Sequence, residues 1–325
     1  DNNYMVDWGD GATTTNAASH TYATAATRTI TVSGRLPGGI TFDTYRYNAA
    51  HHGEQRLTKV NTALLHQDSP DMTYIFRGCA NLASIPDNLF ASNTQVTSIS
   101  NAFYNCTILT TIPDNLFASN TQVTNFASAF YGCTTLTTIP ATLFANNTQV
   151  ASFNGAFRGC TTLTTIPDNL FANNTQVMNF NNAFRDCTTL TTIPATLFAN
   201  NTQVTDFSSA FYGCTTITTI PATLFANNTQ VTTFNSAFRG CTGLISIPAN
   251  LFDNNTHVTT FNYAFYGCTG IGSSTDLPDW WNDAKYPAAT YPQFHLTDAD
   301  AVRMFTNCTN ARNFSSVPTT PLVWK

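Results

Sequence analysis

The stretch AFRGCTTLTTIPDNLFANNTQV, residues 156–177, decides the fold, because nearly the same phrase recurs along the chain. Its cysteine returns at a constant interval of 27 residues, at Cys79, Cys106, Cys133, Cys160, Cys187, Cys214, Cys241 and Cys268. A fixed period of this kind is typical of solenoids, in which each unit stacks on the next and no unit buries its apolar face alone. The sequence therefore predicts a stack of 27-residue coils.

The apolar positions of the repeat predict what each coil buries. Counted from the cysteine, Leu or Ile stands at +3, Ile at +6, Leu-Phe at +10 and +11, Val at +17, Phe or Ile at +20, and Ala-Phe at +23 and +24. The β-branched LTTI and VTxF segments predict short strands. Proline at +7 predicts one or two helical turns over the PATLFANN segment. The Asn at +14 suits a turn, where its side chain bonds local backbone or the next coil.

The cysteines predict a structural column rather than a reactive site. Their total is nine with Cys308, and an odd number cannot pair completely. Equivalent thiols on adjacent coils point in parallel, which is poor geometry for a disulfide. No Cys-x-x-Cys spacing suggests a metal site. We therefore predict a ladder of small, buried, apolar thiols, with partial bridging and a metal site as the alternatives.

The pattern LxxIPxxLF…VxxFxxAFxxC also resembles a known family, the BspA-type leucine-rich repeats of bacterial surface proteins. The segments MTYIFRGCANL (residues 72–82) and MFTNCTNARNF (residues 304–314) are similar to the MFxgCxxL signature of related repeats. The resemblance covers residues 57–271 and returns at 301–318. It implies an α/β solenoid: a right-handed stack of coils with short strands, short helical turns and a β-rich N-terminal cap.

The segments that flank the repeats differ from them and divide the chain into three expected parts. Residues 6–34 resemble PKD and related Ig-like β-sandwich modules, through residues 7–11, through His20, Thr21 and Tyr22, and through residues 29–32. This resemblance implies a few strands that cap the solenoid. We expect a PKD-like β cap over residues 1–56, the solenoid over 57–271, and a C-terminal cap over 272–325 that contains an insertion and a last partial repeat.

Aromatic residues in the C-terminal insertion and acids near the N-terminus have two interpretations each. Trp280, Trp281 and Tyr286 are suited to covering the end of the stack, as solenoids require; a sugar-binding surface is the alternative. Asp7 and Asp10 suit a tight turn; a calcium ion is the alternative.

Composition argues against several function classes. Charged residues make up only 10% of the chain, and the net charge is −5 with no basic run, so we expect no nucleic-acid partner. No apolar stretch approaches the roughly 20 residues that cross a bilayer. Catalytic motifs are absent, and acids come and go between copies, as where Asp168 aligns with Ala141 and Ala195. We expect no enzyme and no cofactor. The pair His51-His52 is interpreted as a loop, with weak metal binding as the alternative.

The residue two positions before each of the first eight cysteines is either Arg or Tyr. This column holds Arg77, Tyr104, Tyr131, Arg158, Arg185, Tyr212, Arg239 and Tyr266. Stacked coils set these side chains in one stripe of aromatic rings and guanidinium groups, with cation–π contacts along it. A ladder that covers one corner of the solenoid explains this column, and because Tyr and Arg are favoured at binding hot spots, the column is also a candidate binding stripe.

Other variable columns suggest further surfaces. A polar column precedes the Ala-Phe pair at Asn125, Ser152, Asn179, Asp206 and Thr233, and it predicts a shallow surface that makes many small contacts. Repeated TTLTT segments, as at residues 134–138, predict parallel Thr ladders, which ice-binding solenoids also have. Asn-x-Thr recurs at Asn146, Asn173, Asn200 and Asn227 and is glycosylated only in a eukaryotic secretory pathway.

The resemblance to surface proteins implies an extracellular or cell-surface protein that serves adhesion. We expect it to recognise a host protein, a matrix component or a glycan through its repeats, without inserting into a membrane. The alternative is a structural spacer, or a self-assembling component of a filament or phage particle, whose stripe contacts copies of itself.

Overall fold

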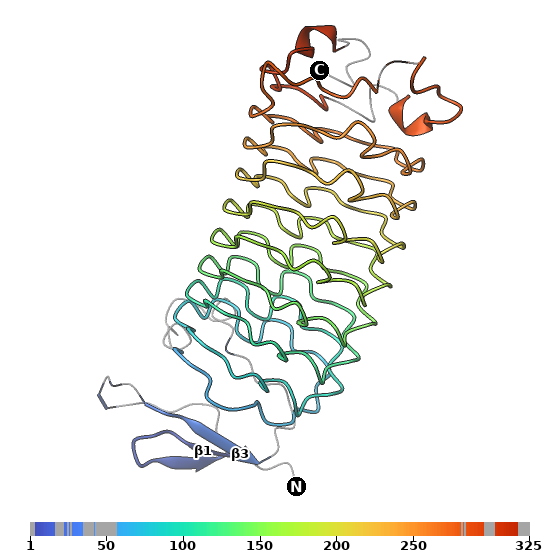
Figure 1. Ribbon diagram of the computed structural model, residues 1–325. Helices are drawn as coiled ribbons and strands as arrows, with labels where there is room; N and C mark the ends of the chain where they lie inside the picture. The colour runs from blue at the N-terminus through green and yellow to red at the C-terminus, as the bar shows by residue number, and fades with distance from the viewer. Residues whose placement is uncertain are drawn as a thin grey trace.

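The computed structural model describes residues 4–16, 23, 24, 26, 28–34, 42, 57–280, 282, 284–295 and 303–317. The repeats form one stack of coils, with the N-terminal sheet at one end and the C-terminal segment at the other (Figure 1). The prediction of stacked 27-residue coils is confirmed, because backbone bridges join equivalent residues of successive coils, from Asp71↔Ser98 to Thr233↔Thr260. In the described part of the chain, no helix has the length and apolar character needed to cross a bilayer.

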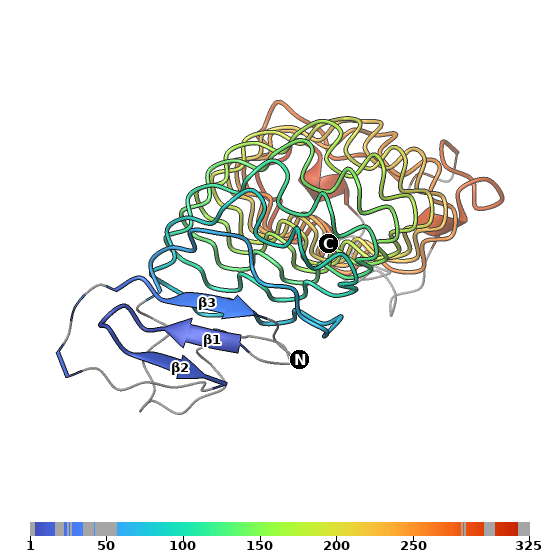
Figure 2. The same ribbon diagram turned by 90° about the horizontal axis from the view of Figure 1, so that it is seen from below.

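The N-terminal segment forms a small antiparallel sheet beside the first coils (Figure 2). Its strands are β1 (Tyr4–Asp7), β2 (Thr13–Thr15) and β3 (Thr31–Gly34), in the order β2-β1-β3. Val6 and Trp8 are buried against it. Asp7 accepts the Gly9 N–H at 2.9 Å and Asp10 accepts the Ala12 N–H at 3.1 Å, so both acids stabilise the turn. The predicted positions His20, Thr21 and Tyr22 lie outside the described residues.

The prediction of short strands and helical turns in the repeats is wrong in detail. The VTxF segments meet through a single parallel bridge per coil, and the LTTI segments through isolated bonds such as Thr191 N–H to Thr164 O at 3.2 Å. The segment after proline forms consecutive turns, in which Leu143 N–H donates to Pro140 O at 3.2 Å. The straight runs are too short for a strand because the chain turns again within a few residues. Among the described residues the helical segments are two 3-10 turns, η2 (Pro292–Phe294) and η3 (Phe314–Ser316).

Two left-handed backbone positions shape the turn that ends each coil. They lie five residues and one residue before the cysteine; in one coil they are Asn182 (φ 57°) and Asp186 (φ 60°), and Gly159 (φ 72°) is the equivalent of Asp186 in the coil before. Asn, Asp and Gly tolerate this conformation best. Between the two positions alternate N–H groups reach the next coil, as Phe157 N–H does to Ala183 O at 2.9 Å. These bonds fix the register of each coil on the next at the turn that carries the column of Tyr and Arg residues.

Three columns of phenylalanine fill the core. Phe157 stacks on Phe184 with ring centroids 5.6 Å apart, and Phe180 stacks on Phe207 at 5.8 Å. A third column, represented by Phe171, runs between these two and tilts 56° to Phe180 at 4.8 Å. All of these rings are 0% exposed. Burial of one such ring stabilises the fold by about 1.5–3 kcal/mol, so the columns contribute strongly to the cohesion between coils.

The Asn at +14 forms a second, polar ladder inside the coil. Asn174 is buried, and its Nδ2 donates to Phe144 O at 3.0 Å and to Asn147 O at 2.9 Å, both on the preceding coil. The same pair of bonds recurs at Asn120, Asn147, Asn201, Asn228 and Asn255. The side chain thus gives two inward backbone carbonyls a second donor, since Phe144 O and Asn147 O also accept N–H groups of their own coil.

We expect Asn174→Ala to lower the free energy of unfolding by about 2–3 kcal/mol, because two buried hydrogen bonds are lost. The matched control is the neighbouring Asn173→Ala, since Asn173 is exposed and makes a single bond, from Nδ2 to Ala145 O at 2.8 Å. That change should cost less than about 1 kcal/mol. Denaturant titrations of both variants measure the difference. Equal losses would contradict a special role for the buried ladder.

Both ends of the stack are covered. Phe42 stacks on Phe76 at 5.3 Å before the first coils. At the other end Trp280 is 0% exposed, donates from Nε1 to Ala249 O at 2.7 Å and stacks on Phe294 at 5.1 Å. After the insertion the stack resumes, because Phe265 N–H donates to Met304 O at 3.0 Å.

The burial of the aromatic residues in the insertion also decides between its two interpretations. Trp280 and Tyr286 are only 0% and 5% exposed, so neither ring is open to a sugar. Both side chains instead reach Ala249 O, at 2.7 and 3.4 Å. Trp281 lies outside the described residues.

Candidate functional site

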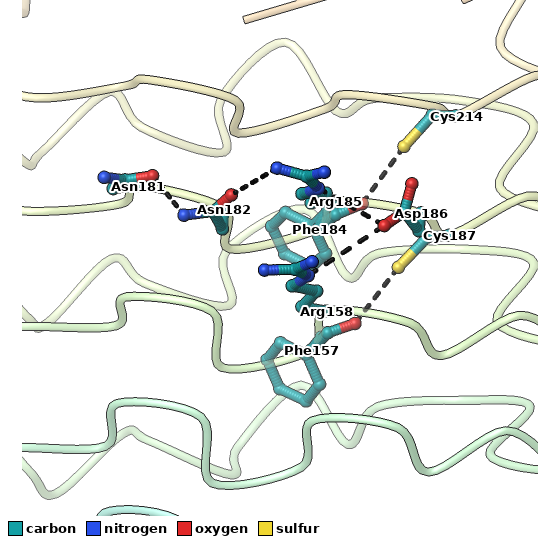
Figure 3. Close-up of polar contacts among 9 residues, drawn as sticks. All are labelled: Phe157, Arg158, Asn181, Asn182, Phe184, Arg185, Asp186, Cys187 and Cys214. Carbon is teal, nitrogen blue, oxygen red and sulfur yellow. Dashed lines mark hydrogen bonds and ion pairs between the residues drawn. The ribbon is translucent and has the colours of Figure 1, made fainter. Parts of the chain in front are cut away.

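The cysteines lie in one buried column and each makes the same contact. Cys187 Sγ donates to Phe157 O at 3.2 Å, and Cys214 Sγ donates to Phe184 O at 3.1 Å (Figure 3). All nine cysteines are buried, and none of them forms a disulfide. Burial raises the pKa of Cys133 and of Cys241 to about 12. A thiol that stays protonated at neutral pH is neither a good nucleophile nor a metal ligand, so the column is structural.

Metal ligands do not gather elsewhere in the structure. Over the described residues no cluster of three or more His, Cys, Asp or Glu side chains is arranged to hold an ion. The predicted pair His51-His52 lies outside those residues. A cavity of about 290 Å³ lies at the C-terminal cap, where Lys285 Nζ and Asp279 Oδ1 are paired at 2.7 Å on its wall.

The stripe two residues before each cysteine stacks planar groups in two runs, Tyr104–Tyr131–Arg158 and Arg185–Tyr212–Arg239–Tyr266. Tyr104 and Tyr131 lie face to face with ring centroids 4.3 Å apart and planes 6° from parallel. The guanidinium of Arg158 lies 5.2 Å over the Tyr131 ring. Both faces of the Tyr131 ring are therefore covered by its neighbours in the column.

The second half of the stripe continues in the same way. Tyr212 lies between Arg185, 4.1 Å from its ring centroid, and Arg239, 5.5 Å away. Arg239 also lies 4.7 Å over Tyr266. At the other end Arg77 turns to Tyr74, at 4.1 Å. All eight members of the stripe are half-buried, so their outer edges face solvent.

One carboxylate enters the stripe at its centre, on the backbone position next to Arg185. Asp186 Oδ2 lies 3.3 Å from Arg185 Nε and 3.9 Å from Arg158 Nε, so it bridges guanidiniums of two adjacent coils (Figure 3). Arg185 Nη1 also donates to Asn182 Oδ1 at 3.4 Å. The three charged side chains keep 31%, 28% and 41% exposure at Arg158, Arg185 and Asp186. Sequence reasoning missed this acid, because Gly and Asn occupy the same position in the other coils.

The positively charged side chains of residues 60–284 all lie in the stripe. Between residues 60 and 284 the only Lys or Arg side chains are Arg77, Arg158, Arg185 and Arg239, and all four belong to the stripe. The same segment contains no Glu, and its Asp side chains lie mostly in other columns, as Asp87, Asp114 and Asp168 do. A cationic line therefore runs along an acidic protein. The confinement of all Lys and Arg side chains of this segment to one column can be seen in the sequence. It indicates a binding surface more strongly than the alternation of Tyr and Arg does.

The polar column before Ala-Phe has a structural role that explains its residue types. Asn179 Oδ1 accepts the Asn181 N–H at 2.7 Å, Asp206 Oδ1 accepts the Ser208 N–H at 2.7 Å, and Ser152 Oγ accepts the Asn154 N–H at 3.2 Å. Ser, Thr, Asn and Asp exchange freely here because each supplies the acceptor of the same turn. Its variation thus follows from local geometry.

Side chains of the Thr and Asn columns also form hydrogen bonds between coils. Thr189 Oγ1 donates to Thr161 O at 2.9 Å, and Asn146 Nδ2 donates to Ala118 O at 3.0 Å, so a sugar attached to that nitrogen would compete with the stack. The Thr ladders at +4 and +5, represented by Thr164 and Thr165, are exposed. They form the rows on which the ice-binding alternative rests.

No protein-family model matches the sequence, and no curated protein matches it. Among solved structures, the chain is similar to a chain of the Toll–Spatzle complex from Drosophila, with 19% identity and a TM-score of 0.34 over 60% of this chain and 28% of that one. It is also similar to a chain of the TLR13–ssRNA13 complex, with 14% identity and a TM-score of 0.38 over 63% of this chain and 33% of that one. The chain thus spans a third or less of each.

Proposed function

We propose that this protein is an extracellular or cell-surface binding protein without catalytic activity, and that it serves adhesion. In this proposal the coils are BspA-like leucine-rich repeats that act as a rigid scaffold, and the contact surface is the stripe. The ligand is a host protein, a matrix component or a glycan. The observation that carries the proposal is that all basic side chains of residues 60–284 lie in one half-exposed line with the tyrosines.

The chemistry of the stripe favours binding over a role as a corner cover. A cover needs only apolar contact, which Tyr alone would supply, yet half of the positions carry Arg. The core beneath changes little between copies: Phe130, Phe157 and Phe184 are all 0% exposed under Tyr131, Arg158 and Arg185. An unchanging core beneath a half-buried line that varies between Tyr and Arg, both hot-spot residues, is what a binding surface has.

The covered ends of the stack count against assembly of copies end to end. Phe76 and Phe305, in the outermost described coils, are both 0% exposed, so neither of these two rings is open to a second copy. A filament would then have to form through the sides. Sedimentation of the purified chain over a range of concentrations tests this alternative, and a mass that rises with concentration would support it.

The proposal is tested by probing arrays of purified matrix proteins and glycans with the purified chain. A stripe variant, with Tyr104, Tyr131, Arg158 and Arg185 all changed to Ala, is probed in parallel. We expect a specific signal that the variant loses by at least about ten-fold, because several hot-spot side chains are removed together.

The control variant carries Thr164→Ala and Thr165→Ala on an exposed column elsewhere on the coil, and it should bind as the unchanged chain does. A signal that survives in the stripe variant would move the binding surface to another face. Silence of the folded chain on every array would favour the spacer.

A further inference from the structure

We propose that the stripe captures an extended acidic polypeptide segment, and that Arg158 and Arg185 at its centre hold one carboxylate of that segment. Asp186 then occupies the place that the ligand's carboxylate takes. This inference rests on the proposed function, since it names the ligand class for the same surface. The first argument for it is that only certain parts of the stripe side chains remain accessible to a ligand.

Tyr131 and Tyr212, the two rings with a planar group on either side, offer their edges and not their faces. Tyr131 has Tyr104 on one face and Arg158 on the other, and Tyr212 has Arg185 and Arg239. Nucleobases stack on open aromatic faces, and so do the apolar faces of sugar rings. What remains outward is a line of Tyr hydroxyls and guanidinium N–H groups, which are hydrogen-bond donors. The complementary ligand is rich in acceptors and carries negative charge.

The spacing of charge favours sparse carboxylates over a densely charged polymer. Coils stack about 4.8 Å apart, so the four guanidiniums from Arg77 to Arg239 are spread over about 29 Å. A nucleic-acid strand carries one phosphate every ~3.4 Å, which is far denser than this line. The guanidiniums are three, one and two coils apart, which is about 14, 5 and 10 Å along the stack. Side chains on one face of an extended peptide recur about every 6.7 Å, so carboxylates placed irregularly along such a peptide are the nearer match. The stripe therefore suits an extended peptide with interspersed Asp or Glu.

Asp186 shows how the pair of guanidiniums holds a carboxylate. Its Oδ2 lies 3.3 and 3.9 Å from Nε of Arg185 and Arg158, and it reaches them from the backbone of the same coil as Arg185. Guanidinium–carboxylate bonds are charge-assisted and stronger than neutral ones. An intramolecular acid at this point competes with the ligand, so its removal should strengthen binding. This gives the proposal a test in which affinity increases.

The repeat itself supplies substitutions that keep the fold. Tyr stands at the stripe position of other coils, so the double variant Arg158→Tyr, Arg185→Tyr continues the stack of rings. Asn105 occupies the equivalent of Asp186 with φ 57° against 60°, so Asp186→Asn fits the left-handed turn. The charge-matched control is Asp168→Ala, because it also removes one acid and Ala141 stands at the same position in the preceding coil.

The experiment measures binding of a fluorescein-labelled peptide of alternating Glu and Ser to the full chain, by fluorescence anisotropy at low and high salt. A length of about ten residues spans the stripe when extended. We expect Arg158→Tyr, Arg185→Tyr to weaken binding at least about thirty-fold. Asp186→Asn should strengthen it about three- to five-fold, and Asp168→Ala should leave it nearly unchanged. High salt should weaken binding in all cases. A Lys–Ser peptide and heparin serve as the other probes.

The outcomes separate this inference from the function on which it rests. The inference is overturned if the acidic peptide does not bind, if Asp186→Asn and Asp168→Ala act alike, or if heparin binds through the arginines and the peptide does not. The binding function survives each of these results if the stripe variant still loses its partner on the arrays. The binding function fails if the folded chain is silent on every array, and the stripe is the wrong surface if its substitutions affect no partner.

Discussion

The free energy of unfolding is expected to fall steeply once the pH rises above 9.0, the ordinary pKa of a cysteine thiol. Burial raises the pKa of Cys133 and of Cys241 to about 12, so the unfolded chain ionises at a lower pH than the folded one. The stabilisation is complete below 9.0 and is lost as the pH rises toward about 12. Each thiol then contributes a loss of about 1.4 kcal/mol per pH unit. The pKa values of Cys106, Cys160, Cys187, Cys214 and Cys268 are raised in the same direction.

Denaturant titrations at a series of pH values between 9.0 and about 12 measure this slope. The comparison is with the double variant Cys133→Ala, Cys241→Ala, whose slope should be shallower by about 2.7 kcal/mol per pH unit because two ionising groups are gone. Lys and Tyr ionise in both proteins, so the difference isolates the thiols. Parallel slopes would show that the column titrates as exposed cysteines do.

The largest loss from a single substitution is expected at the centre of the Phe columns. Phe157 is 0% exposed and stacks on Phe130 at 5.5 Å and on Phe184 at 5.6 Å. Phe157→Ala removes the ring from two interfaces and leaves a cavity, which costs about 3–5 kcal/mol. Denaturant titration of the variant measures the loss.

Two controls accompany this prediction. Phe157→Leu keeps most of the volume, so it should cost clearly less than Phe157→Ala. Thr164→Ala, on the exposed column, should stay within about 0.5 kcal/mol of the unchanged chain. If Phe157→Ala cost no more than Thr164→Ala, the coils would not be held together by the ring columns.

The 27-residue spacing of the cysteines is enough to predict the stack of coils and its buried residues. Positions that are equivalent in a solenoid share one environment, so the repeated Leu, Ile and Phe had to be core. The same reasoning misjudged local structure, because β-branched residues in LTTI favour a strand only where the run is long enough. The left-handed turns were hidden as well: Tyr74 and Ser209 adopt φ 68° and 55° at a position where Gly stands in just one coil.

The stripe was predictable as a column, while its chemistry needed the structure. Sequence spacing places Arg158 next to Tyr131 and Arg185 next to Tyr212, and the cation–π contacts follow from that placement. Which faces of the rings stay open depends on rotamers that spacing does not give. Asp186 was hidden for a related reason, because a residue beside the column enters it only through the left-handed turn at φ 60°.

The coils touch only their immediate neighbours, and this has a consequence for how the chain folds. The bonds between coils join residues 25–30 positions apart, so a typical contact spans roughly 0.08 of the chain length, as in fast-folding helical bundles. No distant segment has to be found before a coil becomes stable on its neighbour. Folding can begin at any adjacent pair of coils and spread in both directions. During synthesis each coil can therefore settle on its predecessor soon after it leaves the ribosome, before the C-terminal cap has been made.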